Sequence, residues 1–294
     1  MNEHPTQTTI KGEARLKGVG LHTGARSQIT FRPAPANAGI RFFRADLPDT
    51  PMIPARLEFV VTTVRGTNLG LGAVKIHTVE HVLSACTGVG LDNADIHVSA
   101  NEPPIMDGSA RPFAEALLKA GLEHLPQSAK RWQHIPGEVL YSDGTASYRA
   151  TPAEAFELKA TLVHNHPMMP KMTLDIRLDR ETYLAELAGA RTFCFEHEVA
   201  FLRSQGLAQG GSLDNAIVIG KGKFHTNSEG LRYPDEFVRH KLLDLIGDLT
   251  LIGRPLFKMR VEAECPGHAH NIEFARRLCA AALSLRKIAA VVEA

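Results

Sequence analysis

The order of predicted elements on either side of one polar connection constrains the fold of this 294-residue chain most strongly. The connection runs from 123 to 136 and is rich in proline and basic residues. On each side, segments typical of strands are followed by a helical pattern, a further strand and a second helix. This order predicts an α+β fold with two similar domains, 1–125 and 130–294, each a β-sheet with two helices. The chain is long enough for each domain to bury a core of its own.

The apolar patterns and the Gly and Pro signals also predict where the individual elements lie, although no internal sequence repeat relates the two halves. Before the connection we expect strands at 28–32, 40–44, 74–77 and 94–98, and helices at 81–87 and 111–120. After it we expect strands at 137–142, 147–151, 156–163 and 258–263, and helices at 235–251 and 272–289.

Charge and cysteine usage exclude several classes of protein. Lys plus Arg number 33 and Asp plus Glu number 32, which gives a net charge of +1. A charge this small provides no positive electrostatic field that would attract nucleic acid. The four cysteines lack Cys-x-x-Cys spacing, which argues against a disulfide framework or a cysteine-rich zinc site. The polar N-terminus lacks the apolar core of a signal peptide, and no window approaches the ~20 apolar residues of a membrane span. We therefore expect a cytoplasmic protein with reduced thiols and no transmembrane segment.

The segment RHKLLDLIGD at 239–248 places three side chains of metal-ligand type on one face of a predicted helix. His240 and Asp244 are four residues apart, within reach of a single cation, and Asp248 continues the row. The apolar residues of the segment lie on the opposite side. A solvated polar face is the alternative interpretation. Such faces mostly carry Glu, Lys and Arg, whereas Asp and His are poor helix formers, and this favours a metal platform.

A second segment, HTVEH at 77–81, begins a predicted helix that ends near Gly88 and Gly90. Taken alone, His-x-x-Glu-His is the inverted zinc-peptidase pattern, in which His77 and His81 bind zinc and Glu80 is the base. Surface histidines at the start of a helix are the alternative interpretation of these five residues.

A third segment, CPGHAHN at 265–271, places His268 directly after the turn signal Pro266-Gly267, in the turn that precedes the last predicted helix. The positive end of the helix dipole disfavours its protonation, whereas a nearby carboxylate such as Asp248 would favour the charged form. Taken alone, a histidine in the position of His268 is more often a loop histidine than a catalytic residue.

Together these segments resemble one family, the UDP-3-O-acyl-N-acetylglucosamine deacetylases, which are zinc amidases of bacterial lipid A synthesis. The resemblance extends over nearly the whole chain and keeps the order of the motifs. They are GVGLHTG at 18–24, TVEH at 78–81, GLDN at 90–93, PIMDGSA at 104–110, NHP at 165–167, ARTF at 190–193, GGS at 210–212, DEFVRHK at 235–241 and GHA at 267–269.

The resemblance implies that His81, His240 and Asp244 hold one zinc ion and that His77 is not a ligand. Zinc in hydrolases takes three protein ligands and leaves a position for water. Glu80 is implied as the base that takes a proton from the attacking water. The expected product chemistry is removal of the N-acetyl group and release of acetate.

Four more residues receive a role by the same resemblance. His268 is expected to be the protonated histidine that steadies the oxyanion and donates a proton to the leaving amine, and Asp248 to orient it. Thr192 is expected to help hold the tetrahedral oxygen, and Lys241 to lie near the sugar and phosphates. A base and an acid whose pKa values differ in this way suit amide hydrolysis near neutrality.

The resemblance also implies an architecture and a lipid site. Both domains are expected to share one topology, with the helices packed between outer sheets and the active site at the interface. An insert at about 191–219 is expected to clasp the acyl chain. Its implied lining is Leu21, Val199, Ala208, Gly211, Ala216 and Val218, and His22, Phe193 and His164 are further expected substrate contacts.

The chain departs from the family at three places. Cys265-Pro266 stands where the family has Lys-Ser, so Lys258 or Arg260 would have to supply the cation for the diphosphate. His164 stands where the family often has an aromatic residue that stacks on uracil. The loop at 61–71 aligns less clearly, and there Thr67 and Asn68 are the expected substitutes beside the metal.

Three hypotheses result from the sequence. The first is a monomeric zinc amidase that acts on a UDP-linked acylated amino sugar. The second is a zinc peptidase that uses His77, His81 and Glu80 with a third ligand on a later helix. The third is a non-catalytic binding protein with a closed four-ligand zinc site, which gives Glu80 no role.

Overall fold

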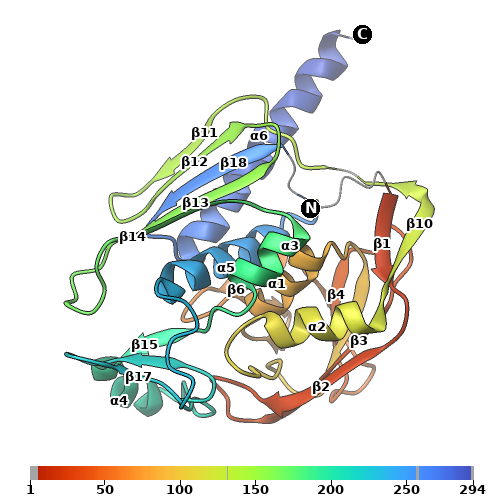
Figure 1. The fold of residues 1–294 in the computed structure, drawn as a ribbon. Helices are drawn as coiled ribbons and strands as arrows, with labels where there is room; N and C mark the ends of the chain where they lie inside the picture. Colours follow the sequence, from red (N-terminus) through yellow and green to blue (C-terminus); the bar gives the residue numbers. More distant parts are fainter. Residues whose placement is uncertain (1–5, 131, 256–257, 293–294) are drawn as a thin grey trace.

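The structure is a computed structural model that describes residues 6–130, 132–255 and 258–292. Two five-stranded sheets lie on the outside of the molecule, and the principal helices lie between them (Figure 1). This arrangement confirms the predicted α+β fold. Among the described residues, no helix is both long and apolar enough to cross a membrane.

The first sheet has the strand order β2-β3-β9-β4-β5. Its strands are β2 (Ala14–Val19), β3 (Arg26–Pro33), β4 (Ile40–Arg44), β5 (Met52–Pro54) and β9 (Ala94–Val98). β4 and β9 run parallel and the other neighbours are antiparallel. Helices α1 (Glu80–Val89) and α2 (Arg111–Ala120) belong to this half.

The second sheet repeats this topology strand for strand. Its order is β11-β12-β18-β13-β14, with β13 and β18 parallel and the other neighbours antiparallel. The strands are β11 (Val139–Ser142), β12 (Ser147–Pro152), β13 (Phe156–Leu162), β14 (Met172–Arg177) and β18 (Met259–Glu264). The helices are α5 (Glu236–Thr250) and α6 (His268–Val292), so the two halves share a topology that their sequences do not reveal.

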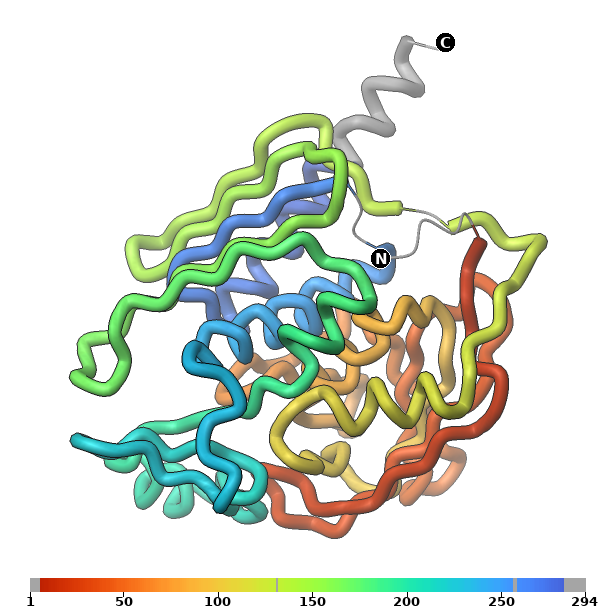
Figure 2. The backbone as a smooth tube through the Cα atoms, in the orientation of Figure 1, coloured from red at the N-terminus to blue at the C-terminus, as the bar shows by residue number. Residues whose placement is uncertain are grey.

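Local sequence explains why these elements form. Alternate side chains of β13 are buried from Phe156 to Leu162, as expected for a strand with one face against helices. α1 ends at Gly90, which has a φ of 82° and donates its N–H to the carbonyls of Cys86 and Thr87. α5 is buried along almost its whole length because it is the central helix between both halves (Figure 2).

The expected polar connection at 123–136 contains a strand that the sequence did not predict. β10 (Leu122–Ala129) pairs antiparallel with β1 (Thr6–Ile10) in a separate two-stranded sheet. The register shifts between Thr6 and Gln7, which leaves Pro126 in an irregular part of the pair. A proline is tolerated in such a place because it has no N–H to donate to the ladder.

Smaller elements complete the structure. A three-stranded sheet of β6 (Val60–Thr62), β7 (Asn68–Leu71) and β8 (Val74–Ile76) precedes α1, and the 3-10 turn η1 covers Leu57–Phe59. The helical segment α3 (Arg180–Thr182) continues into the π-helical turn η2 (Tyr183–Leu187). The predicted insert forms β15 (Phe193–Phe195), α4 (Glu196–Ser204) and β16 (Ile217–Ile219), followed by β17 (Phe224–His225).

Candidate metal centre and active site

Three buried side chains from two helices form the centre of the site. His81 lies in the first turn of α1, and His240 and Asp244 lie one turn apart on α5. One ligand atom from each lies within 4.8 Å of the others, and the residues are 3%, 2% and 1% exposed. Nε2 of His240 is 3.3 Å from Oδ1 of Asp244, and Nε2 of His81 is 3.7 Å from the same oxygen. The predicted face of α5 is therefore buried, and its interpretation as a solvated face is wrong.

The donor set fits a divalent metal such as zinc. Nδ1–H of His240 donates to the carbonyl of Ala190 at 3.1 Å, so its Nε2 keeps a lone pair directed at the cluster. Burial lowers the pKa of both histidines, that of His81 to about 3, and keeps them neutral. Oδ1 of Asp244 is buried and has no hydrogen-bond partner within the described residues. A bound cation would satisfy this oxygen.

Helices α1 and α5 approach closely beside the cluster. A Cβ atom on Gly247 would lie 2.1 Å from the carbonyl oxygen of Glu80. No side chain fits at that distance, so glycine allows the two backbones to meet there. This contact limits how far His81 on α1 lies from His240 and Asp244 on α5.

Glu80 is buried next to His81, and one oxygen of its carboxylate is held by the loop before β7. The backbone N–H of Thr67 donates to Oε2 of Glu80 at 3.0 Å. Burial raises the pKa of Glu80 to about 8; the charge of His268 opposes this shift, and Asp248 and Asp244 add to it. Glu80 is therefore a stronger base than an exposed carboxylate.

His268 stands opposite Glu80 at the start of α6. Its Nδ1–H donates to Oδ2 of Asp248 at 3.0 Å, and its Nε2 lies 3.9 Å from Glu80 Oε1 and 3.8 Å from Asp244 Oδ2. Burial alone would lower its pKa, but Asp248, Asp244 and Glu80 outweigh burial and raise the pKa to about 9. The ring is therefore a cation near neutral pH.

A hydrogen-bonded chain fixes Asp248 behind this histidine. Nδ2 of Asn271 donates to Oδ2 of Asp248 at 2.8 Å, and the hydroxyl of Tyr148 donates to Oδ1 of Asn271 at 2.6 Å. On the other side, the hydroxyl of Thr67 donates to Oδ1 of Asp248 at 2.5 Å. Because both oxygens of Asp248 are engaged, the ring of His268 has one favoured orientation.

Lys241 and Thr192 belong to the segments that carry His240 and its acceptor Ala190. Nζ of Lys241 donates to Oδ2 of Asp244 at 2.8 Å and lies 5.4 Å from the centre of the Phe193 ring. Thr192 is between Ala190, whose carbonyl binds His240, and Phe193, whose ring is edge-on to His240 at 6.1 Å. Its backbone N–H donates to the carbonyl of Gly108 at 2.9 Å.

The residues predicted to contact the acyl chain are divided between the insert and the turn after β2. A Cβ atom on Gly211 would touch Ala208 and would lie 3.8 Å from Cδ1 of Leu21. Val199 lies on α4, and Ala216 and Val218 lie before and within β16. The side chain of Val218 is half-buried, whereas those of its sequence neighbours Ile217 and Ile219 are buried.

His22 and His164 occupy different positions around this insert. Nε2–H of His22 donates to the carbonyl of Arg65 at 3.1 Å, and its Nδ1 accepts from the N–H of Ala208 at 3.4 Å. His22 thereby joins the loop before β7 to the insert. The exposed ring of His164 packs on Phe195 with 4.4 Å between ring centres.

Two residues that the sequence suggested for other roles lie away from the cluster: His77 as a zinc ligand of the peptidase pattern, and Arg260 as the cation for the diphosphate. Nδ1–H of His77 donates to Oδ1 of Asn68 at 3.0 Å, and His77 is not one of the three clustered ligands. The guanidinium of Arg260 is paired with Asp175, Glu157 and Glu262 on the second sheet, where those carboxylates already neutralise it.

Known proteins match this chain over nearly its whole length. The profile of the family described as UDP-3-O-acyl N-acetylglycosamine deacetylase matches residues 7–280. The chain belongs to this deacetylase family. A UDP-3-O-acyl-N-acetylglucosamine deacetylase of Teredinibacter turnerae is 44% identical over 274 residues, 92% of this chain and 89% of the relative. One of Saccharophagus degradans is 45% identical over 267 residues, 90% and 87% of the two chains. A third, of Anaeromyxobacter dehalogenans, is 42% identical over 274 residues, 93% and 87% of the two chains.

Several residues that build the site of this deacetylase-family chain were not identified from the sequence. Asn271 follows His268 by three residues, and that spacing on one helix face is a signal that could have identified it. Gly247 lies inside a predicted helix, where a glycine lowers helix stability, so a packing reason for it could have been expected from the sequence. Tyr148 lies in a strand far from His268 in sequence, and no local pattern connects the two.

The buried pair Arg191 and Glu236 was also missed. Both side chains are fully buried, and Nε of Arg191 donates to Oε1 of Glu236 at 2.8 Å. The same carboxylate accepts from the backbone N–H of Arg191 and of Arg232. This ion pair holds the segment that carries Ala190 and Thr192 against the first turn of α5.

Proposed function

We propose that this chain is a zinc-dependent hydrolase that removes the N-acetyl group from UDP-3-O-acyl-N-acetylglucosamine in lipid A biosynthesis. The observation that carries the proposal is the buried His81, His240 and Asp244 cluster with Glu80 and His268 facing each other beside it. Membership of the deacetylase family, with relatives matched over most of their length, supports the same substrate. The two domains of the proposal are 1–125, with Glu80 and His81, and 130–294, with His240, Asp244, His268 and the insert at about 191–219.

In this proposal His81, His240 and Asp244 hold the zinc. When bound, zinc polarises the amide carbonyl and acidifies a water molecule. Nδ1–H of His240 stays on the Ala190 carbonyl and keeps the ring in the ligating orientation. Asp244 keeps a second oxygen for Lys241, which offsets part of its negative charge.

Glu80 and His268 divide the proton transfers. Glu80 takes a proton from the attacking water molecule. The oxygen of that water forms the new C–O bond to the carbonyl carbon of the acetyl group. The imidazolium of His268 stabilises the negative charge on the carbonyl oxygen and gives its proton to the nitrogen as the C–N bond breaks. Thr192 is proposed to hold the same oxygen. The products are acetate and the free amine of the sugar.

Substrate contacts complete the proposal. Leu21, Gly211 and the half-buried side chains of the insert would contact the acyl chain, and Lys241 would lie near the sugar and phosphates. Phe193 would pack at the mouth of the site because it contacts both His240 and Lys241. His22 would act by holding the insert against the first half of the chain.

Metal analysis together with a deacetylation assay tests this function. The purified chain should contain about one zinc and release acetate from UDP-3-O-acyl-N-acetylglucosamine. Removal of the metal by a chelator should abolish release, and added zinc should restore it. A zinc-loaded chain that binds the substrate but releases no acetate would contradict the proposal.

A further inference from the structure

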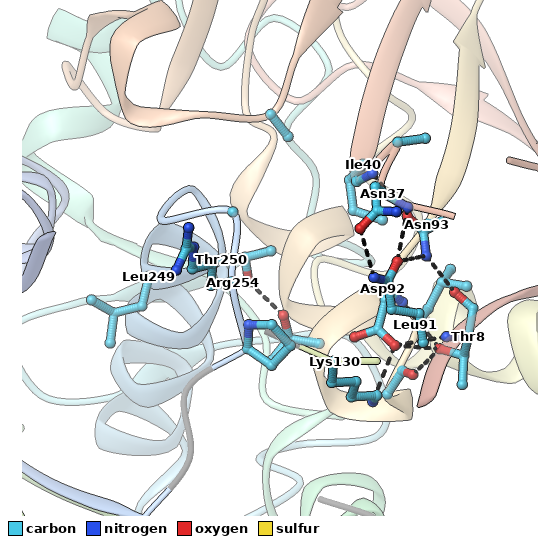
Figure 3. A pocket seen from close by; sticks show the side chains of 18 of the residues that line it. Thr8, Asn37, Ile40, Leu91, Asp92, Asn93, Lys130, Leu249, Thr250 and Arg254 are labelled. Atoms are coloured by element: carbon cyan, nitrogen blue, oxygen red, sulfur yellow. Dashed lines mark hydrogen bonds and ion pairs between the residues drawn. The ribbon is translucent and has the colours of Figure 1, made fainter. Parts of the chain in front are cut away.

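A cavity lies between the two halves of the molecule, at the C-terminal ends of α1 and α5. Its volume is about 220 Å³. In Figure 3, Leu249, Thr250 and Arg254 form one side of it, and Asn37, Asp92 and Lys130 are on the other. None of the residues placed at the metal cluster lines this cavity, so it is separate from the proposed active site.

Positive charge is concentrated around this cavity. Its lining includes Arg56, Lys130, Arg180 and Arg254, whereas Asp92 is the only carboxylate among the described residues that line it. The whole chain has a net charge of +1, so this excess does not follow from composition. Several cations around one partly enclosed space repel one another unless an anion lies between them.

Two of these cations have partners in the protein. Nζ of Lys130 lies 3.1 Å from Oδ2 of Asp92, and its side chain is 6% exposed. Nε of Arg180 donates to the carbonyl of Val89 at the end of α1, at 3.0 Å. The single carboxylate of the lining is therefore already engaged by Lys130.

The other two cations are Arg56, which is exposed, and Arg254, which is half-buried. In the described ranges 6–130, 132–255 and 258–292, no hydrogen bond or ion pair engages either guanidinium. Arg56 lies against the turn that immediately precedes Arg254. The backbone N–H of Leu57 donates to the carbonyl of Leu251 at 3.0 Å, and a Cβ atom on Gly253 would lie 3.2 Å from Nη1 of Arg56.

The rest of the lining indicates what kind of molecule fits. The amides of Gln7 and Asn93 are hydrogen-bonded to each other, and Gln7 also bonds to Asn37, so this wall is polar but already satisfied. Ile40 and Leu249 contribute apolar surface. A ligand with a small organic body and a strongly anionic group matches both surfaces.

We propose that this cavity binds a small organic anion through a phosphate or carboxylate group held between Arg56 and Arg254. A guanidinium offers paired N–H donors in the geometry that both acid groups accept. Arg56 comes from the first half of the chain and Arg254 from the second, so the ligand bridges the two halves. Binding therefore stabilises their junction at the far ends of the helices that carry the metal ligands.

Calorimetric titration of the zinc-loaded full chain with inorganic phosphate and with citrate tests the proposal. Ionic strength is matched with sodium chloride, because exposed charges are screened by salt. We expect saturable binding of at least one of the two probes, and the stronger probe identifies the acid group. Arg56→Gln and Arg254→Gln should each weaken binding by about tenfold or more, since each removes a charge-assisted hydrogen bond.

Lys221→Gln is the matched control, because Lys221 is exposed in the turn between β16 and β17 and its loss changes net charge equally. It should leave binding unchanged within about twofold. In anion-free buffer, Arg56→Gln and Arg254→Gln should not lower the melting temperature, because each relieves repulsion. Saturable binding that is equal in all variants, no binding of either probe, or a lowered melting temperature without anion would each overturn the proposal. None of these readouts depends on deacetylase activity.

Discussion

The Nδ1 atom of His268 lies 3.0 Å from Oδ2 of Asp248, and this contact directs the Nε2 atom of the same ring toward Glu80. The carboxylate therefore has two effects on the histidine. It raises the pKa of the ring, and it orients the proton that the proposed reaction needs at Nε2.

The pH dependence of hydrolysis should reflect this pair. Glu80 acts without its proton, so kcat/KM should rise as pH increases through its raised pKa. His268 acts with its proton, so kcat/KM should fall as pH increases through about 9. His268→Gln should retain zinc, lose the decline of kcat/KM at alkaline pH and lower kcat by ~10²-fold or more.

His270→Gln is the control for this variant, because His270 pairs with Asp143. A near-normal kcat in His268→Gln would remove this residue from the mechanism.

Asn271→Leu should lower kcat without loss of metal. The change removes the hydrogen bond from Asn271 to Asp248 and leaves the hydroxyl of Tyr148 without its acceptor. A hydrogen bond to a charged group contributes about 1.5–3 kcal/mol, so a decrease in kcat of about tenfold or more is expected. Tyr148→Phe, which removes only the outer bond, should have a smaller effect. A change in KM alone, at constant kcat, would show that Asn271 does not position His268.

The metal ligands should lack redundancy. His81→Ala, His240→Ala and Asp244→Ala should each lower zinc content and abolish turnover, because three ligands leave none to spare. His77→Ala should keep its metal, since its ring bonds to Asn68 outside the cluster. Zinc content is measured by elemental analysis after dialysis. Full occupancy in His240→Ala together with loss in His77→Ala would reverse the ligand assignment.

Gly247→Ala should destabilise the protein and impair the site together. Its Cβ atom would overlap the carbonyl of Glu80, so α1 and α5 would have to separate. Overpacking of this kind costs roughly 1–3 kcal/mol of unfolding free energy, which urea denaturation can measure. Gly222→Ala is the matched control, because its Cβ atom would meet nothing within 4 Å. Equal stability of the two variants would contradict the close approach of the helices.

Binding of the substrate's acyl chain should depend on the free space next to Gly211. A tryptophan there would extend toward Leu21 and Ala208. Each buried methylene contributes about 0.8 kcal/mol, so blocking this space should raise KM steeply for a long-chain substrate and little for a short-chain analogue. Gly137→Trp, in open space, serves as the control, and zinc content should stay constant. Equal losses on both substrates would mean that Gly211 supports the fold and not the acyl chain.

The sequence by itself determined the elements that carry a periodic signal. The strands predicted at 40–44 and 94–98 coincide with β4 and β9, and the helix predicted at 111–120 coincides with α2. The row of His240, Asp244 and Asp248 on one helix face also follows from spacing, because positions four apart are neighbours on any helix. The motifs were sufficient to identify the family, which the comparison confirms.

Only the tertiary structure decided what surrounds that row. The buried environment of α5 comes from packing against α1 at Gly247, and the neighbours Thr67, Tyr148 and Asn271 come from three separate segments. β10 was missed because its pairing with β1 joins positions more than a hundred residues apart, and its proline and polar composition resemble a linker. Local sequence fixes which side chains share one face of an element. Long-range packing decides which faces meet, because that depends on the whole arrangement of helices and sheets.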